Sequence, residues 1–196
     1  MISLVKKIER LKKSPVSKLV KQRISGFRKN KTDNELFSEL CFCTMTAGFR
    51  ADKSIEIQKK IGNGFLTLPE KELQKKLKDL GYRYHNRAQY IAQNRKHAFE
   101  LRGKDREWLV KNIKGLGYKE ASHFLRNIGK CDCAIIDFHI IDILAKYKLI
   151  KRPKTLTKAK YIEIEKVLEN LAKNTGLTLD ELDLYLWFLE TGKILK

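Results

Sequence analysis

Hydrophobic residues recur at every third or fourth position along most of the chain, the spacing that places side chains on one face of an α-helix. Ile2, Val5, Ile8 and Leu11 begin the series. The same spacing predicts helices over 16–27, 34–49, 54–61, 67–80, 86–99, 106–113, 119–128, 138–149 and 157–172, and one that starts at 178. Alternating apolar and polar positions, the pattern of a β-strand, are nearly absent. The sequence therefore predicts an all-α protein.

The local sequence also distinguishes some helices from the others. Residues 36–47 are apolar on most sides, which is typical of a helix buried at the centre of a bundle. Thr67 with Glu70, and Thr178 with Glu181, have the spacing of a capping box at a helix start.

The charge of the chain indicates its kind of partner. The 196 residues include 42 Lys and Arg against 23 Asp and Glu, a formal net charge of +19. Hydrophobic residues make up 42% and there are only 3 prolines, so the charge is carried by a folded body rather than a disordered tail. This composition favours a polyanionic partner such as nucleic acid, and the length predicts one domain or two closely packed lobes.

Nothing in the sequence predicts a membrane span or an export signal, so we expect a cytoplasmic protein. The four cysteines form two Cys-x-Cys pairs, at 41/43 and 131/133, in a chain large enough to fold without disulfides. We expect reduced thiols and no metal site. Cys41 and Cys43 lie in a helical pattern, and a helix turns side chains two residues apart to different sides, so they would not share a metal.

Two predicted helices meet at a Gly-x-Gly turn formed by Gly115 and Gly117. Glycine permits a positive φ and close approach of the backbone, and the N–H groups at the start of the following helix can bind an anion. Lys111, Lys114 and Lys119 add the positive charge that phosphate contacts require. The pattern predicts a helix-hairpin-helix at 106–129, although an ordinary helix C-cap glycine would give the same letters.

Asp137 interrupts the strongly apolar segment 134–144. Burial of an unpaired carboxylate is unfavourable, so this residue has a specific role. It could be the N-cap of the helix that begins at Phe138, a catalytic group, or both.

The stretch Gly115-Leu116-Gly117-Tyr118-Lys119, followed by Ile136-Asp137-Phe138-His139, resembles the hairpin, catalytic lysine and catalytic aspartate of the helix-hairpin-helix DNA glycosylase superfamily. Segments 39–43, 119–127, 182–187 and 191–196 are similar to the archaeal-type class of 8-oxoguanine DNA glycosylase/AP lyases. The resemblance spans nearly the whole chain, so residues 1–196 are expected to form a single helical glycosylase unit. It implies two helical lobes, 30–110 and 1–29 plus 111–196, with the active site in the cleft between them.

The resemblance also implies a reaction, which begins when the damaged base is flipped out of the duplex. The Lys119 amine would attack the sugar C1′, displace 8-oxoguanine and form a Schiff base that nicks the strand by β-elimination. The attacking amine must be neutral, and nearby cations such as Lys114 would favour that form. Asp137 would stabilise positive charge on the sugar and assist proton transfer.

Further residues receive roles by the same resemblance. Asp183, Trp187 and the C-terminal Lys196 would bind the extruded base, the last in place of an ordinary frayed terminus. The DNA-binding residues would be Tyr84, as a wedge in the duplex, together with Arg83, Lys114, Gly115, Gly117 and His139.

Two positions depart from the class, which often has Asn where Gly48 stands and Arg where Phe138 stands. No cofactor is required by this reaction, and the hairpin carbonyls are a candidate site for a structural monovalent cation. The expected protein is a monomer that acts on duplex DNA containing 8-oxoguanine, at no membrane and in association with the nucleoid. The alternative is a non-catalytic helix-hairpin-helix DNA-binding module.

Overall fold

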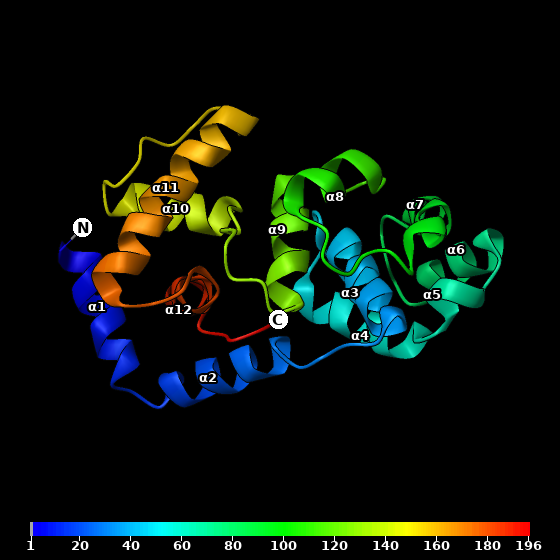
Figure 1. The fold of residues 1–196 in the computed structure, drawn as a ribbon, viewed down its shortest axis with the longest axis horizontal. Coiled ribbons are helices and arrows are strands. Elements are labelled where there is room, and N and C mark those ends of the chain that lie inside the picture. The colour runs from blue at the N-terminus through cyan, green and yellow to red at the C-terminus, as the bar shows by residue number, and fades with distance from the viewer. Residues whose placement is uncertain (1) are drawn as a thin grey trace. The chain divides into compact units, whose positions relative to one another are not determined.

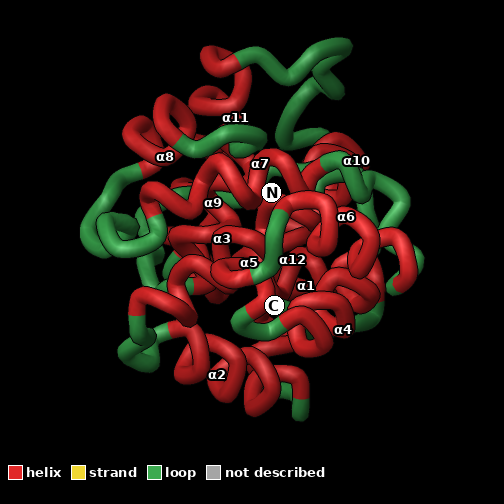
Figure 2. The backbone as a smooth tube through the Cα atoms, turned by 90° about the vertical axis from the view of Figure 1, so that its right-hand side faces the viewer, coloured by secondary structure: helices red, strands yellow, loops and turns green. Residues whose placement is uncertain are grey.

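The computed structural model describes residues 2–196, all of whose regular structure is helical (Figures 1 and 2). The helices are α1 (Ile2–Lys12), α2 (Val16–Phe27), α3 (Asp33–Thr46), α4 (Ala51–Ile61), α5 (Gly64–Thr67), α6 (Glu70–Asp79), α7 (Arg87–Asn94), the 3₁₀ helix η1 (Arg95–His97), α8 (Arg106–Asn112), α9 (Tyr118–Asn127), α10 (Phe138–Lys146), α11 (Lys158–Thr175) and α12 (Leu179–Thr191). The all-α prediction is confirmed. The four-residue α5 was not predicted, and the helix expected over 86–99 is divided into α7 and η1.

The described residues divide into two compact units, and the division falls within α9. The terminal unit contains residues 2–29 and 125–196, and the central unit contains 30–124. Residues 111–124 therefore group with 30–110, and not with the two termini as the sequence suggested. The reason is local packing: Asn94 exchanges hydrogen bonds with the backbone of Lys114, and the rings of Phe42 and His123 lie 5.5 Å apart.

Helix α3 forms the core of the central unit, as its sequence predicted. It packs against α4, α5 and α7, and most of its side chains are buried. Its start is fixed by a capping box in which Thr32 N–H donates to Glu35 Oε2 at 2.7 Å and Glu35 N–H donates to Thr32 Oγ1 at 3.3 Å. The Thr32 hydrogen bonds hold the pKa of Glu35 below its usual value.

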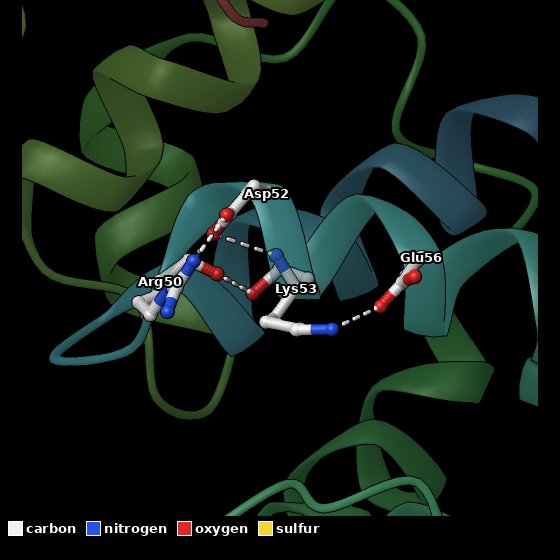
Figure 3. A network of polar contacts seen from close by, with 5 residues as sticks. Arg50, Asp52, Lys53 and Glu56 are labelled. Carbon is white, nitrogen blue, oxygen red and sulfur yellow. Dashed lines mark hydrogen bonds and ion pairs between the residues drawn. The ribbon is translucent and has the colours of Figure 1, made fainter.

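The α3–α4 loop is anchored where α4 begins (Figure 3). Arg50 holds the Asp52 carboxylate through two nitrogens, with Nη2 to Oδ2 at 2.5 Å and Nε to Oδ1 at 3.1 Å. The Lys53 N–H donates to Asp52 Oδ1 at 2.9 Å, and Lys53 Nζ donates to Glu56 at 2.8 Å. This network fixes the end of the loop that carries Gly48.

In the terminal unit, α12 packs against α1, α2, α10 and α11. One buried cluster joins α2 to α12 and consists of Val20, Ile24, Phe27, Leu184 and Tyr185. The capping box predicted at Thr178 is confirmed, since Glu181 accepts from the Thr178 N–H at 3.0 Å. The one predicted at Thr67 is wrong: that residue ends α5, its hydroxyl donates to Asn63 O, and α6 has no side-chain cap.

The four cysteines are free thiols; Cys41 and Cys43 are buried, whereas Cys131 is exposed. Burial raises the pKa of the Cys41 thiol well above its usual value. Within residues 2–196, no helix is both long and apolar enough to cross a membrane.

Candidate active site

The hairpin between α8 and α9 has the geometry that its glycines predicted. Gly115 has φ +84°, and a Cβ there would lie 2.7 Å from the Tyr90 ring, so this position needs glycine. Asn94 clamps the turn from behind: its Nδ2 donates to Lys114 O at 3.0 Å, and its Oδ1 accepts from Lys114 N at 2.9 Å. Gly117 does not have a positive φ, so only one of the two glycines needs that freedom. Because α9 begins at Tyr118, the N–H groups of its first turn have no acceptor within the helix.

Lys119 is the second residue of α9, and its side chain is 23% exposed. Its Nζ lies 3.4 Å from Oε1 of Glu120, whose side chain is 15% exposed. Two opposing influences therefore act on this ammonium group. The N-terminal end of a helix disfavours a cation, whereas the Glu120 carboxylate favours it. Lys114, which we expected to act on the amine, lies over the Tyr90 ring at 5.9 Å.

Asp137 is the N-cap of α10, which confirms the first of the two roles considered for it. Its Oδ1 accepts from the Ile140 N–H at 3.0 Å, and the residue is half-buried. Its other carboxylate oxygen makes no hydrogen bond with any described residue. The cap thus fixes the carboxylate and leaves one oxygen available for chemistry.

Three aromatic side chains form consecutive contacts that lead from this cap to α12. The rings of Phe138 and His139 lie 3.9 Å apart, and His139 meets Trp187 edge to face at 4.8 Å. Phe138 is 62% exposed. The Trp187 Nε1–H is buried and has no acceptor in the described part of the chain, which is the condition in which an indole can donate to a ligand.

Asp183 lies one turn before Trp187 on α12, so the two share a helix face. Its Oδ2 is 3.6 Å from Nη2 of Arg126, with side-chain exposures of 11% and 6%. Arg126 also lies over the Phe27 ring at 4.6 Å. Its Nε and Nη1 are buried with no hydrogen-bond partner among residues 2–196. Asp183 is therefore held beside a largely buried cation.

The C-terminal tail belongs to the same unit as α12. Gly192, with φ +71°, ends the helix, and Ile194 packs against the cluster formed by α2 and α12. Lys196 is half-buried. The tail is thus folded against the terminal unit, which differs from the frayed end typical of a terminus.

Tyr84 lies in the loop between α6 and α7, close to two cations. The guanidinium groups of Arg83 and Arg87 each lie 5.1 Å from the centre of its ring. Arg87 also donates to the carbonyl oxygen of Thr44, at the end of α3. A Cβ on Gly48, which has φ +72°, would lie 3.4 Å from the Tyr84 hydroxyl. The ring is therefore supported from several sides by the central unit.

The site residues named from the sequence fall into two groups, one in each unit. The central unit holds Lys119, Lys114, Gly115, Gly117, Arg83 and Tyr84, and the terminal unit holds Asp137, His139, Asp183, Trp187 and Lys196. Two neighbours of these groups were missed. Glu120 was detectable as the residue next to Lys119, whereas Arg126 had no signal because its partner lies 57 positions further along the chain.

Comparisons with known proteins show which family the chain is similar to. The sequence model of the 8-oxoguanine DNA glycosylase family matches residues 20–177. The 8-oxoguanine DNA glycosylase/AP lyases of Methanocaldococcus jannaschii and Korarchaeum cryptofilum are 52% and 49% identical, over 98% of this chain and 99% and 98% of theirs.

Solved structures show the same similarity. The crystal structure of the Methanocaldococcus jannaschii 8-oxoguanine glycosylase/lyase with a 15mer DNA containing 8-oxoguanine has a TM-score of 0.95 at 50% identity, covering 99% of this chain and 100% of that one. The 8-oxoguanine DNA glycosylase of Thermotoga maritima has a TM-score of 0.93 at 41% identity, with 99% of each chain covered. The chain belongs to the 8-oxoguanine DNA glycosylase family.

Proposed function

We propose that this protein is a DNA glycosylase/AP lyase that excises 8-oxoguanine from duplex DNA and nicks the strand by β-elimination. The observation that carries this proposal is the place of Lys119, directly after the hairpin turn at the start of α9, in a chain similar over its whole length to 8-oxoguanine DNA glycosylase/AP lyases.

Lys119 is the proposed nucleophile. Its uncharged amine attacks C1′ of the flipped nucleotide, the glycosidic bond breaks, and the base leaves with the bonding electrons. The nitrogen then loses a proton and the C1′–O4′ bond breaks, which opens the sugar ring and gives the imine. The imine makes the C2′ protons acidic, and loss of one of them expels the 3′ phosphate. Before the attack the ammonium form must release a proton, and Glu120 at 3.4 Å is the nearest carboxylate that influences this step.

Asp137 is the proposed electrostatic partner of the reaction. As the glycosidic bond breaks, positive charge develops on the sugar, and a fixed carboxylate oxygen stabilises it without reorganisation. The hydrogen bond from the Ile140 N–H supplies the fixed orientation.

The lesion base is proposed to bind in the terminal unit. Trp187 offers an aromatic face for stacking and a buried N–H that has no acceptor among the described residues. The Asp183 carboxylate can accept from the N–H groups of the base. Lys196, in the tail after α12, is proposed to add its ammonium group. His139 is proposed to approach a phosphate beside the flipped nucleotide.

Binding to the duplex is proposed to rest on charge and on the hairpin. The net charge of +19 supports phosphate contacts by Arg83 and Lys114, with the hairpin glycines close to the backbone and Tyr84 as the wedge. We propose a monomer, associated with the nucleoid through DNA, with a monovalent cation on the hairpin carbonyls. The alternative is a module that binds DNA without catalysis, which the charge and hairpin alone would explain equally well.

Borohydride trapping separates the two. An end-labelled duplex with one 8-oxoguanine is incubated with the protein and sodium borohydride, beside an undamaged duplex. The wild type is expected to give a covalent protein–DNA band and a nicked strand on lesion DNA, and Lys119→Gln neither. Lys71→Gln, which removes an exposed lysine from α6 in the same unit, is the matched control and is expected to trap normally. Tight binding with no trapping by the wild type would establish the non-catalytic module instead.

A further inference from the structure

We propose that Tyr161 and Glu165, on α11, are positioning residues for Asp137. They form what we call the α11 latch, which fixes the main chain immediately before this carboxylate. The inference deepens the proposed function and rests on the role given there to Asp137.

The latch consists of three short hydrogen bonds from two side chains to one backbone segment. The Ala134 N–H donates to Glu165 Oε1 at 2.8 Å. The Tyr161 hydroxyl donates to Ala134 O at 2.7 Å and accepts from the Ile136 N–H at 3.1 Å. Both side chains are almost completely buried, with Tyr161 at 2% and Glu165 at 5% exposure.

The geometry of α11 explains why two side chains suffice. Tyr161 and Glu165 are four residues apart and therefore lie on the same face of the helix. In an extended chain, the polar groups of residues i and i+2 point to the same side, toward a neighbouring strand. The latch supplies the partners that this strand would supply to Ala134 and Ile136.

The segment depends on these partners because it has no regular structure of its own. Residues 130–137 lie between α9 and α10 outside any helix, and Ala134 and Ile136 are buried at 3% and 0% exposure. Buried backbone N–H and C=O groups need hydrogen-bond partners. If the Tyr161 hydroxyl is lost, Ala134 O and Ile136 N lose theirs and the segment must shift to find others.

Such a shift passes directly to the carboxylate. Asp137 follows Ile136 in the chain, with φ −108° and ψ −175°, and its Oδ1 is committed to the N-terminus of α10. Displacement of the Ile136 peptide therefore changes the direction in which the Asp137 side chain leaves the backbone. Catalysis is sensitive to this, since an error of about 1 Å in a reacting group can cost about 100-fold in rate.

The test is a double-mutant cycle on the excision rate. The rate constant for release of 8-oxoguanine is measured with enzyme in excess over duplex, for Tyr161→Phe in the wild type and in the Asp137→Asn background. We expect a loss of about 10-fold in the wild type and of less than about 2-fold beside Asp137→Asn, where no charged carboxylate remains to be positioned. The dissociation constant for lesion DNA is expected to stay unchanged.

Two controls distinguish positioning from general stability. Tyr185→Phe removes another hydroxyl from a tyrosine buried in the same unit, at 3% exposure, and is expected to leave the rate unchanged. Glu165→Gln keeps an oxygen that can accept from the Ala134 N–H, so its excision rate should equal that of the wild type. Glu165→Leu has no such oxygen, so its excision rate should fall. This second pair also tests the latch if Tyr161→Phe does not fold.

The outcomes separate the latch from the proposed function. An equal loss in both backgrounds, or no loss in the wild type, would overturn the latch while the Asp137 role stands. A full rate for Asp137→Asn would overturn both, because no carboxylate would then need positioning.

Discussion

The ion pair between Arg126 and Asp183 gives a prediction about how the base-binding residues are held. The perturbation consists of Asp183→Asn, which keeps the shape of the side chain, and Arg126→Met, which keeps an unbranched side chain but removes the guanidinium group over the Phe27 ring. Each single change removes one member of this ion pair and leaves the charge of the other member largely buried. The double change removes both charges together.

The magnitude follows from the separation and the burial. At 3.6 Å and an effective dielectric constant of about 20, the two charges attract by about 5 kcal/mol. Their desolvation offsets much of this gain, and the separation is too long for a strong hydrogen bond. We expect each single variant to lower the free energy of unfolding by about 3 kcal/mol, and the double variant by about 4 kcal/mol, a coupling of about 2 kcal/mol.

The assay is urea unfolding of the wild type and the three variants, followed by circular dichroism. Arg28 and Asp180 supply the matched control in the same unit, at 3.3 Å but with the Arg28 side chain 50% exposed. Solvent screens this pair, so its coupling should be at most about 1 kcal/mol despite the shorter distance. Additive losses for Arg126 and Asp183, or a larger coupling for the control pair, would refute the reasoning that burial sets the strength of the interaction.

Three further predictions concern titratable groups. Burial raises the pKa of Tyr82 from 10.0 to about 12; its contribution to stability is complete below pH 10 and is lost as the pH rises toward 12. Denaturant titrations should therefore show that the free energy of unfolding of the wild type falls between pH 9 and pH 12. In Tyr82→Phe this fall should be smaller by up to about 3 kcal/mol. Glu120→Gln removes the carboxylate 3.4 Å from the Lys119 amine. Borohydride trapping at pH 6 should therefore become faster by up to about 5-fold, the equivalent of about 1 kcal/mol. Slower trapping would instead assign the proton transfer to Glu120. With a thiol reagent at pH 7.5, Cys131 should react first and the buried Cys41 only after unfolding; labelling of Cys41 in the folded protein would contradict its raised pKa.

The positions of most helices could be read from the sequence because amphipathic spacing is a local property. The details that failed depend on contacts outside the local segment. The helix expected over 86–99 changes to a 3₁₀ turn after Asn94, whose side chain is engaged with the hairpin backbone at Lys114. The helix expected to reach residue 149 ends at Lys146, where the chain turns and Lys148 adopts φ +56°.

The candidate site divides in the same way. Lys119 and Asp137 could be named because a hairpin motif and an isolated carboxylate are visible in sequence order. Tyr161, Glu165 and Arg126 could not, because they occupy ordinary positions on helices.

The sequence alone determined the helical class, the polyanionic partner and, through the resemblance, the lysine and the aspartate of the proposed reaction. Only the tertiary structure decided that residues 111–124 belong to the central unit, that Arg126 is buried beside Asp183, and that α11 holds the segment before Asp137. The physical reason is that helix formation and turn geometry depend on neighbours in sequence. Burial and hydrogen-bond partners depend instead on which distant segments the core brings together.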